Sequence, residues 1–148
     1  MKKKTVKIIL GIIFGMLAAI AFYAYIEFNR KVKDLSYVKA GIHMDAAQLI
    51  STFEKNETAG NSQFLDKIIA VKGNVKAVEK TDKGYYTVIL GGDNSMSSVR
   101  CSMDSVHQDE VADITAGTVI TMKGSCTGFN RDELLGSDVI LNRCVVQN

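Results

Sequence analysis

The sequence predicts a mostly β domain of the α+β class, a five-stranded Greek-key barrel with an N-terminal helical arm, preceded by a transmembrane helix. Three observations lead to this prediction. Residues 8–26 carry no charged side chain. Apolar residues between positions 45 and 64 recur at helical spacing, and from residue 68 onward they alternate with polar residues along five short segments.

The apolar segment from Ile8 to Ile26 predicts a membrane helix. At ~1.5 Å per residue it would extend about 28 Å, close to the ~30 Å hydrocarbon thickness of a bilayer. Four lysines precede the segment and three basic residues follow it. The positive-inside rule therefore favours a cytoplasmic N-terminus and a domain on the outer side of the membrane. The alternative is a cleaved signal peptide with a small-residue site at Ala19–Ala21, which delivers the domain to the same side.

The 148 residues are enough for this anchor and one domain. Residues 1–33 are assigned to the basic tip and anchor, residues 34–43 to a polar tether, and residues 44–148 to the folded domain. The whole chain carries a formal charge of +2. Eleven basic and fifteen acidic residues lie from position 34 onward, so the tether and domain together carry −4.

A helical arm opens the domain. Asp45 is the predicted N-cap, and Gln48 stands three positions later at the spacing of a capping box. An apolar stripe at helical spacing predicts a helix that ends near Asn56, and its members are Leu49, Ile50 and Phe53. Residues 57–64 predict a second helical turn or two, which can bring Phe64 and Leu65 to the core.

Five strands follow, each with apolar or small residues at every second position. They are predicted over residues 68–77, 85–90, 99–103, 118–126 and 138–146, with a hairpin turn at residues 82–84. A short helix over residues 105–114 separates the third strand from the fourth. This order matches the five-stranded Greek-key OB-fold barrel. Gly73 and Gly124 fit the sharp strand bends that a small barrel needs.

Several segments also carry a resemblance to a known family. From about Met44 to Val145 the chain resembles the tRNA-anticodon-binding-like OB-fold family of bacterial envelope proteins. This resemblance implies an OB fold, and it carries over no catalytic or ligand residue. Many members have a lipobox cysteine where this chain has its apolar span. The matching segments are Asp45–Glu57, Phe64–Lys67, Val71–Val75, Val99–Cys101, Lys123–Phe129 and Asp138–Cys144.

The three cysteines are Cys101, Cys126 and Cys144, and none forms a CxxC pair. This spacing argues against a zinc ribbon or a thioredoxin-like redox motif. The third and fifth strands of an OB barrel are adjacent and parallel, so Cys101 and Cys144 could meet in a disulfide outside the cytoplasm. The alternatives are buried thiols that act as small core residues, or a reactive thiol.

The histidines and acidic residues do not form a predicted site. His43 precedes the first helix, and His107 lies in the predicted short helix, where Ser105 would point in a different direction. We expect both histidines on the surface, and we predict no metal and no cofactor. The acidic residues around that helix predict a solvated face rather than a cation site: Asp104, Asp109, Glu110 and Asp113.

Nucleic-acid binding is the function that an OB-fold invites. Such domains bind single strands with a basic groove and stacking aromatic side chains. This domain is acidic and the chain has no tryptophan. The available basic and aromatic side chains would form only a small footprint: Tyr85, Lys72, Lys76 and Lys123.

The sequence therefore predicts a non-enzymatic binding module of the bacterial cell envelope, with a protein or a small ligand as its target. OB-folds bind with the face of their second and third strands and with the adjoining loops. By that analogy of fold, the expected binding residues are Tyr85, Thr87, Arg100 and Phe129. A nucleic-acid-binding protein is the alternative function. A hydrolytic or redox enzyme would need a catalytic cluster that the sequence does not show.

Overall fold

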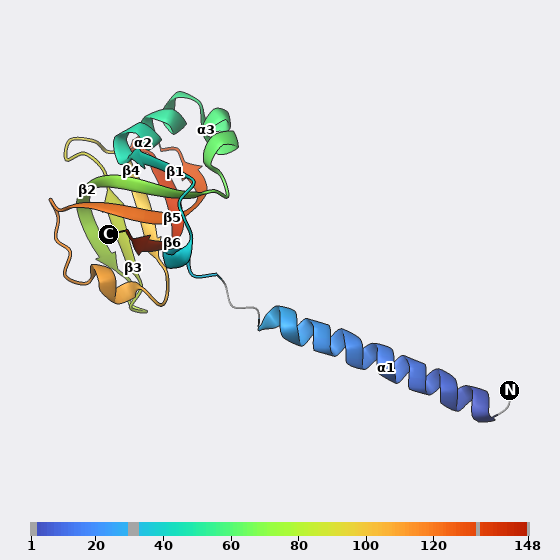
Figure 1. Cartoon of the computed structure of the whole chain (residues 1–148). Helices are drawn as coiled ribbons and strands as arrows, with labels where there is room; N and C mark the ends of the chain where they lie inside the picture. Colours follow the sequence, from blue (N-terminus) through green and yellow to red (C-terminus); the bar gives the residue numbers. More distant parts are fainter. Residues whose placement is uncertain (1–2, 30–32, 133, 148) are drawn as a thin grey trace. The chain divides into compact units, whose positions relative to one another are not determined.

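The structure is a computed structural model that describes residues 3–29, 33–132 and 134–147. It divides into two compact units, residues 1–33 and residues 34–148. The first unit is helix α1 (Lys3–Phe28) (Figure 1). Within it, Lys7–Phe28 is long and apolar enough to cross a membrane, judged by length and composition. The side chains described along this stretch are exposed. A helix that is apolar on all sides is typical of a membrane span.

The second unit is a β-barrel with helices at its ends (Figure 1). Its helices are η1 (Leu35–Tyr37), α2 (Ala46–Lys55), α3 (Glu57–Phe64) and η2 (Gln108–Val111), of which η1 and η2 are 3₁₀ helices. Its strands are β1 (Ile42–Asp45), β2 (Ile68–Lys80), β3 (Tyr86–Leu90), β4 (Ser98–Met103), β5 (Val119–Asn130) and β6 (Asp138–Val146).

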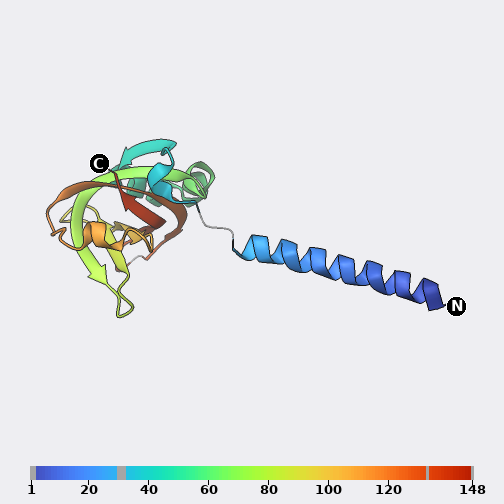
Figure 2. The same cartoon turned by 60° about the horizontal axis from the view of Figure 1, so that its bottom comes forward.

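The strands form one sheet in the order β1-β2-β3-β4-β6-β5, and β2 also pairs with β5 and so closes the barrel. β4 and β6 run parallel, whereas the pairs β2–β3, β3–β4, β5–β6 and β2–β5 are antiparallel. Figure 2 shows the strands curving around a common interior. The five strands β2 to β6 thus make the OB-fold barrel that the sequence predicts.

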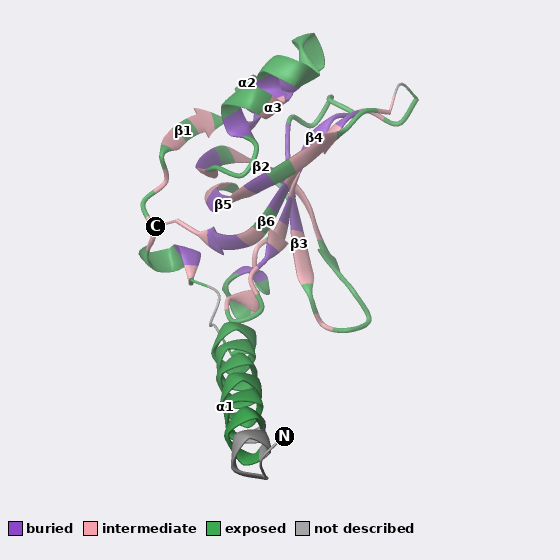
Figure 3. Cartoon of the chain, turned by 90° about the vertical axis from the view of Figure 1, so that its right-hand side faces the viewer, coloured by how far each residue is buried: buried purple, intermediate pink, exposed green. Residues whose placement is uncertain are grey.

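Apolar side chains at alternating strand positions fill the interior of the barrel. Ile69, Val71 and Val75 of β2 are fully buried, as are Val88 and Leu90 of β3. Because successive side chains of a strand point to opposite faces, this period of two lines the interior of the barrel. Figure 3 shows buried positions recurring along the strands of the barrel.

Helical residues cover the ends of this core. Leu49 and Phe53 of α2 are fully buried and belong to the same cluster as the barrel residues, and so does Phe64 of α3. Leu65, which was also predicted to reach the core, is instead 40% exposed. The ring of Phe53 lies 5.8 Å from that of Phe64. Val111 of η2 is also fully buried, so the connection between β4 and β5 contributes to the core as well.

The prediction of a polar tether over residues 34–43 is wrong. Leu35 is only 1% exposed, and η1 packs against β5 and β6. Farther along, β1 pairs parallel with β2, with Ile42 opposite Ile69. The prediction overlooked three apolar side chains in this segment. Leu35 is buried, and Ile42 and Met44 pack against the core of the barrel.

Several element ends also differ from the predictions. Asp45 is the N-cap of α2, but its side chain makes no capping hydrogen bond, so no capping box forms. The side chain of Asn56 caps α3 instead and accepts a hydrogen bond from the Ala59 amide. Only Gln108–Val111 of the short helix predicted over residues 105–114 is helical. β5 continues past residue 126 to Asn130.

Candidate functional site

The face predicted for binding is the outer surface of β3 and β4. Thr87 pairs with Ser102, and Ile89 pairs with Arg100. The pair between them, Val88 and Cys101, is fully buried. Because side chains alternate along a strand, Thr87, Ile89, Arg100 and Ser102 share the outer face of the barrel. We call these four residues the outer β3–β4 face.

An ion pair lies across this face. Arg100 donates a hydrogen bond of 2.6 Å from a guanidinium nitrogen to the Glu79 carboxylate of β2. The two side chains are 34% and 53% exposed, so the pair is partly solvated. Arg100 thus presents a compensated charge to a ligand, together with the half-buried hydroxyl of Thr87.

A loop lies at each end of the outer β3–β4 face. Residues 81–85 lead into β3, and residues 91–97 connect β3 to β4. The second loop is held in place, since the Ser97 hydroxyl donates to the Glu54 carboxylate over 2.6 Å and accepts from the Ser137 amide over 3.0 Å. These contacts tie the loop to the end of α2 and to the β5–β6 connection.

The other two predicted binding residues lie in different surroundings. Tyr85 stands in the first loop and is 51% exposed, close in sequence to the outer β3–β4 face. The ring of Phe129 instead stacks on the buried ring of Phe53, with centroids 5.1 Å apart and an angle of 18° between the rings. A register shift in β5 between Cys126 and Gly128 changes the alternation of side chains there. The structure therefore does not bring Phe129 to the face that holds Thr87 and Arg100.

The small basic and aromatic footprint considered for nucleic acid is not assembled as one surface. Lys123 is 7% exposed, and its ammonium donates to the Ser36 carbonyl over 3.1 Å. The Lys76 ammonium donates to the Ser95 carbonyl over 2.6 Å. Lys72 remains exposed on β2, opposite Asp45 of β1. These lysines therefore point to three separate neighbourhoods.

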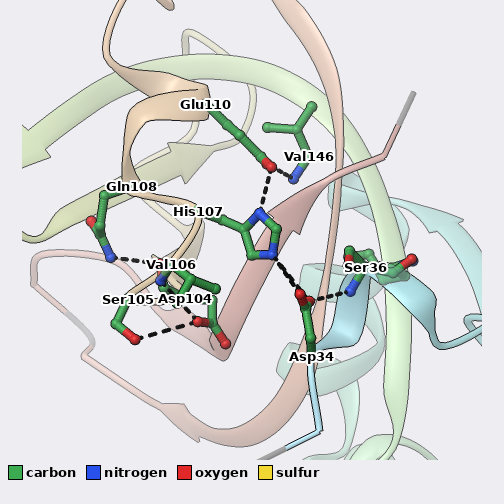
Figure 4. Close-up of polar contacts among 10 residues, drawn as sticks. Asp34, Ser36, Asp104, Ser105, Val106, His107, Gln108, Glu110 and Val146 are labelled. Carbon is green, nitrogen blue, oxygen red and sulfur yellow. Dashed lines mark hydrogen bonds and ion pairs between the residues drawn. The ribbon is translucent and has the colours of Figure 1, made fainter.

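His107 joins two carboxylates, which the sequence did not predict (Figure 4). Its Nε2 lies 3.0 Å from both carboxylate oxygens of Asp34, and its Nδ1 lies 2.6 Å from Glu110. The second carboxylate oxygen of Glu110 accepts a hydrogen bond from the Val146 amide. The prediction that both histidines are surface residues holds for His43, which is exposed, whereas the side chain of His107 is only 18% exposed.

This cluster shifts the titration of its members. The hydrogen bond with Asp34 raises the pKa of His107, against the opposing effect of burial, and the contact with Glu110 adds to the rise. The backbone hydrogen bond from Ser36 and then the contact with His107 lower the pKa of Asp34 to about 2. Both shifts favour a charged imidazolium beside a charged carboxylate.

The cluster lacks the partners of a nucleophilic site. The Ser105 hydroxyl contacts the carboxylate of Asp104 rather than His107. In the described ranges, no group of three histidine, cysteine, aspartate or glutamate side chains is arranged to hold a metal ion. The arrangement can therefore fix the chain and respond to pH, and it has no hydroxyl or thiol in contact with the imidazole.

All three cysteines are free thiols that are fully buried. Cys101 and Cys144 are neighbours that interact, as the adjacency of β4 and β6 predicts. Burial raises the pKa of Cys144 well above its usual value, and burial raises that of Cys126 to about 11. Raised pKa values leave few thiolates, which makes these thiols poor nucleophiles. A disulfide between Cys101 and Cys144 stays a prediction.

Comparisons with known proteins agree with this fold. A family model described as tRNA_anti-like matches residues 1–145. The chain is similar to a "putative nucleic acid-binding lipoprotein" from Klebsiella pneumoniae subsp. pneumoniae MGH 78578, with a TM-score of 0.57 and 17% identity over 80% of this chain and 100% of that chain. It is also similar to a "putative aspartyl-tRNA synthetase" from Leishmania major Friedlin, with a TM-score of 0.47 and 9% identity over 87% of this chain and 26% of that chain. No curated protein matches the chain.

Proposed function

This chain belongs to the tRNA_anti-like family, and from that membership and the geometry of its barrel we propose a membrane-anchored binding module outside the cytoplasm. Its target is a protein or a small ligand of the bacterial cell envelope. The observation that carries the proposal is the outer β3–β4 face, where Thr87 and Arg100 lie diagonally across adjacent strands between two loops. OB-folds bind their ligands with this part of the barrel.

The anchor is the second part of the proposal. The family match begins at residue 1 and so includes α1, whose stretch Lys7–Phe28 has the length and composition of a membrane span. Lysines at the start of the chain support an N-terminus that stays in the cytoplasm. The intact mass of the purified protein tests cleavage, and protease added outside intact cells tests the orientation. An uncleaved chain whose domain is digested from outside would support the anchor.

A role without catalysis is the third part. The imidazole of His107 contacts two carboxylates and no hydroxyl or thiol within the described residues. The three thiols are buried, and two have raised pKa values. Neither feature offers a nucleophile that a substrate could reach, which supports binding rather than turnover.

Nucleic-acid binding is the second candidate, favoured by the description of the similar Klebsiella protein. The charges oppose it. The part of the chain from residue 34 onward carries −4, and Arg100 on the expected face is paired with Glu79. If this candidate were correct, affinity for single strands would fall steeply with salt, because phosphate contacts release counterions.

Partner capture tests the proposal directly. The full-length protein is purified from detergent-solubilised membranes together with Arg100→Glu and a control, Lys67→Glu, which makes the same charge change at an exposed position between α3 and β2. We expect one envelope protein, or one small ligand detected by native mass spectrometry, to remain with the wild type and the control and to be lost from Arg100→Glu. Equal retention by all three proteins would contradict binding through the outer β3–β4 face.

A further inference from the structure

A pocket of about 250 Å³ lies between residues 36–40, which precede β1, and the barrel. It is separate from the outer β3–β4 face. Residues 36–40 form one wall, and Lys123 of β5 and Gln147 contribute the other side. Gln147 is fixed next to β5 because its backbone N–H donates to the Thr121 carbonyl over 2.9 Å. The pocket exists only because residues 34–43 pack on the barrel.

Lys123 supplies a buried positive charge to this pocket. It is 7% exposed, and its ammonium makes one hydrogen bond, to the Ser36 carbonyl. An ammonium group has three N–H donors, so two remain. Within the part of the chain that the structure describes, no carboxylate forms an ion pair with it. Buried charges are normally paired, so this ammonium has unused capacity for an anion.

Gln147 supplies an unused acceptor beside the same pocket. Its side-chain oxygen is buried, and it has no hydrogen-bond partner among the described residues. A buried acceptor without a partner is costly, and native proteins rarely leave one. A ligand that suits this pocket therefore accepts hydrogen bonds from an ammonium group and donates one to an amide oxygen.

The charge of the lining agrees with an anionic ligand. Lys39 and His43 stand beside Lys123 in the lining, and none of the lining residues is acidic. The domain as a whole is acidic, with a net charge of −4 from residue 34 onward. The pocket volume of about 250 Å³ is many times the ~10–15 Å³ that a single water needs on this measure, so a phosphate group and a substituent have room.

We propose that this pocket binds a phosphate group. The Lys123 ammonium pairs with phosphate oxygens, and Lys39 adds a second positive charge to the lining. The Gln147 side-chain oxygen accepts a hydrogen bond from a P–OH group of inorganic phosphate or from a hydroxyl or ammonium group of a lipid headgroup. The site is independent of the outer β3–β4 face, since the two share no residue.

The test uses the full-length protein in dodecyl maltoside micelles, a detergent without phosphate. Inorganic phosphate is added against sodium chloride at equal ionic strength, while amide signals and thermal unfolding are followed. We expect saturable shifts of the amide signals of residues 36–40, and an unfolding temperature that rises with phosphate concentration. A wild type without saturable shifts would overturn the proposal without any variant.

Two variants examine the roles of the residues. Lys123→Met keeps the length of the buried side chain and removes its charge, and Gln147→Glu places a competing carboxylate beside Lys123. Each should weaken phosphate affinity about tenfold or more, the size expected for a lost charge-assisted hydrogen bond. The control Lys83→Met removes an exposed lysine of the β2–β3 loop and should bind phosphate like the wild type. Equal affinity of all four proteins would assign the shifts to an adventitious ion only and overturn the proposal.

A final comparison separates the two sources of phosphate. The wild type is transferred into nanodiscs of phosphatidylglycerol and titrated again. Signals of residues 36–40 that respond to inorganic phosphate in micelles but no longer respond in these nanodiscs would identify a lipid headgroup as the occupant. An unchanged response would identify free phosphate.

Discussion

The imidazole of His107 connects two parts of the chain that lie 73 positions apart, since its Nε2 is 3.0 Å from both carboxylate oxygens of Asp34. Asp34 is the first residue of the barrel unit, and His107 lies in the connection from β4 to β5. The Asp34 carboxylate also accepts a hydrogen bond from the Ser36 amide and so caps η1. One ion pair thus fixes the segment that precedes β1.

Stability should depend on pH through this pair. The pKa of His107 is raised in the folded state, so its contribution is fully present below about pH 6.5 and is lost as pH rises through the raised value. The pKa of Asp34 is lowered to about 2, so its contribution is present above 3.8 and is lost as pH falls through about 2. The pair therefore stabilises the fold most between pH 3.8 and 6.5.

Urea unfolding at a series of pH values in phosphate-free buffer measures this effect. His107→Gln should lose the decline in stability above pH 6.5, because glutamine does not titrate. His43→Gln is the matched control, since His43 is exposed, and it should keep the wild-type profile. A decline of the same size in His107→Gln would show that another group is responsible.

Phe53 should be a principal contributor to stability. Its side chain is fully buried, with the Phe129 ring 5.1 Å and the Phe64 ring 5.8 Å away. Phe53→Ala should lower the free energy of unfolding by about 3–5 kcal/mol, through lost burial and a cavity. Tyr85→Ala changes an exposed aromatic and should stay within about 0.5 kcal/mol of the wild type. Similar losses in both variants would mean that the helical arm does not close the core.

Two glycines with the same backbone angle should respond differently to alanine. Gly84 and Gly136 have φ angles of +84° and +88°, a region that costs an L-residue about 1–2 kcal/mol. A Cβ at Gly84 would meet nothing within 4 Å, whereas one at Gly136 would lie 2.4 Å from the Met96 carbonyl carbon. Gly84→Ala should therefore cost about 1–2 kcal/mol. Gly136→Ala should cost more and should shift the amide signals of residues 91–97. Equal costs would contradict the contact between Gly136, in the β5–β6 loop, and Met96, in the β3–β4 loop.

The thiols should be protected in the folded protein. Without reductant, iodoacetamide should leave the native chain unmodified, because all three thiols are buried. In denaturant, still without reductant, mass spectrometry should find an adduct on each of Cys101, Cys126 and Cys144. An adduct on Cys126 alone would establish the Cys101–Cys144 disulfide. Rapid modification of the native chain would contradict the burial.

The barrel could be predicted because its signal is local. Each of the strands β2 to β6 carries its own alternation of apolar and polar residues, and α2 carries its stripe at helical spacing. β1 has only four residues, and it becomes a strand by pairing with β2 from Ile42↔Ile69 onward. Ile42 and Met44 alternate with polar residues, but this short pattern does not identify the partner strand, because Ile69 lies 27 positions after Ile42.

The sites depended on contacts that no local pattern contains. Lys123 stands at an alternating polar position of β5 and was expected to face outward, but residues 36–40 pass over it and exclude solvent. Phe129 was expected at the binding face, and the β5 register shift after Cys126 turns its ring toward Phe53. Thr87 and Arg100 lie on the outer face, since β3 and β4 pair with each other without a register shift.

The position of β6 has a consequence for how the chain acquires its fold in time. β6 lies between β4 and β5, and it is the last of the six strands. Its first residue, Asp138, bonds to Ser98 across 40 positions of chain. During synthesis from the N-terminus, the edges of β4 and β5 that pair with β6 therefore stay without a partner until residues 138–146 emerge. Open edges invite pairing with other chains, so these seconds of biosynthesis are the period in which the domain is most exposed to aggregation.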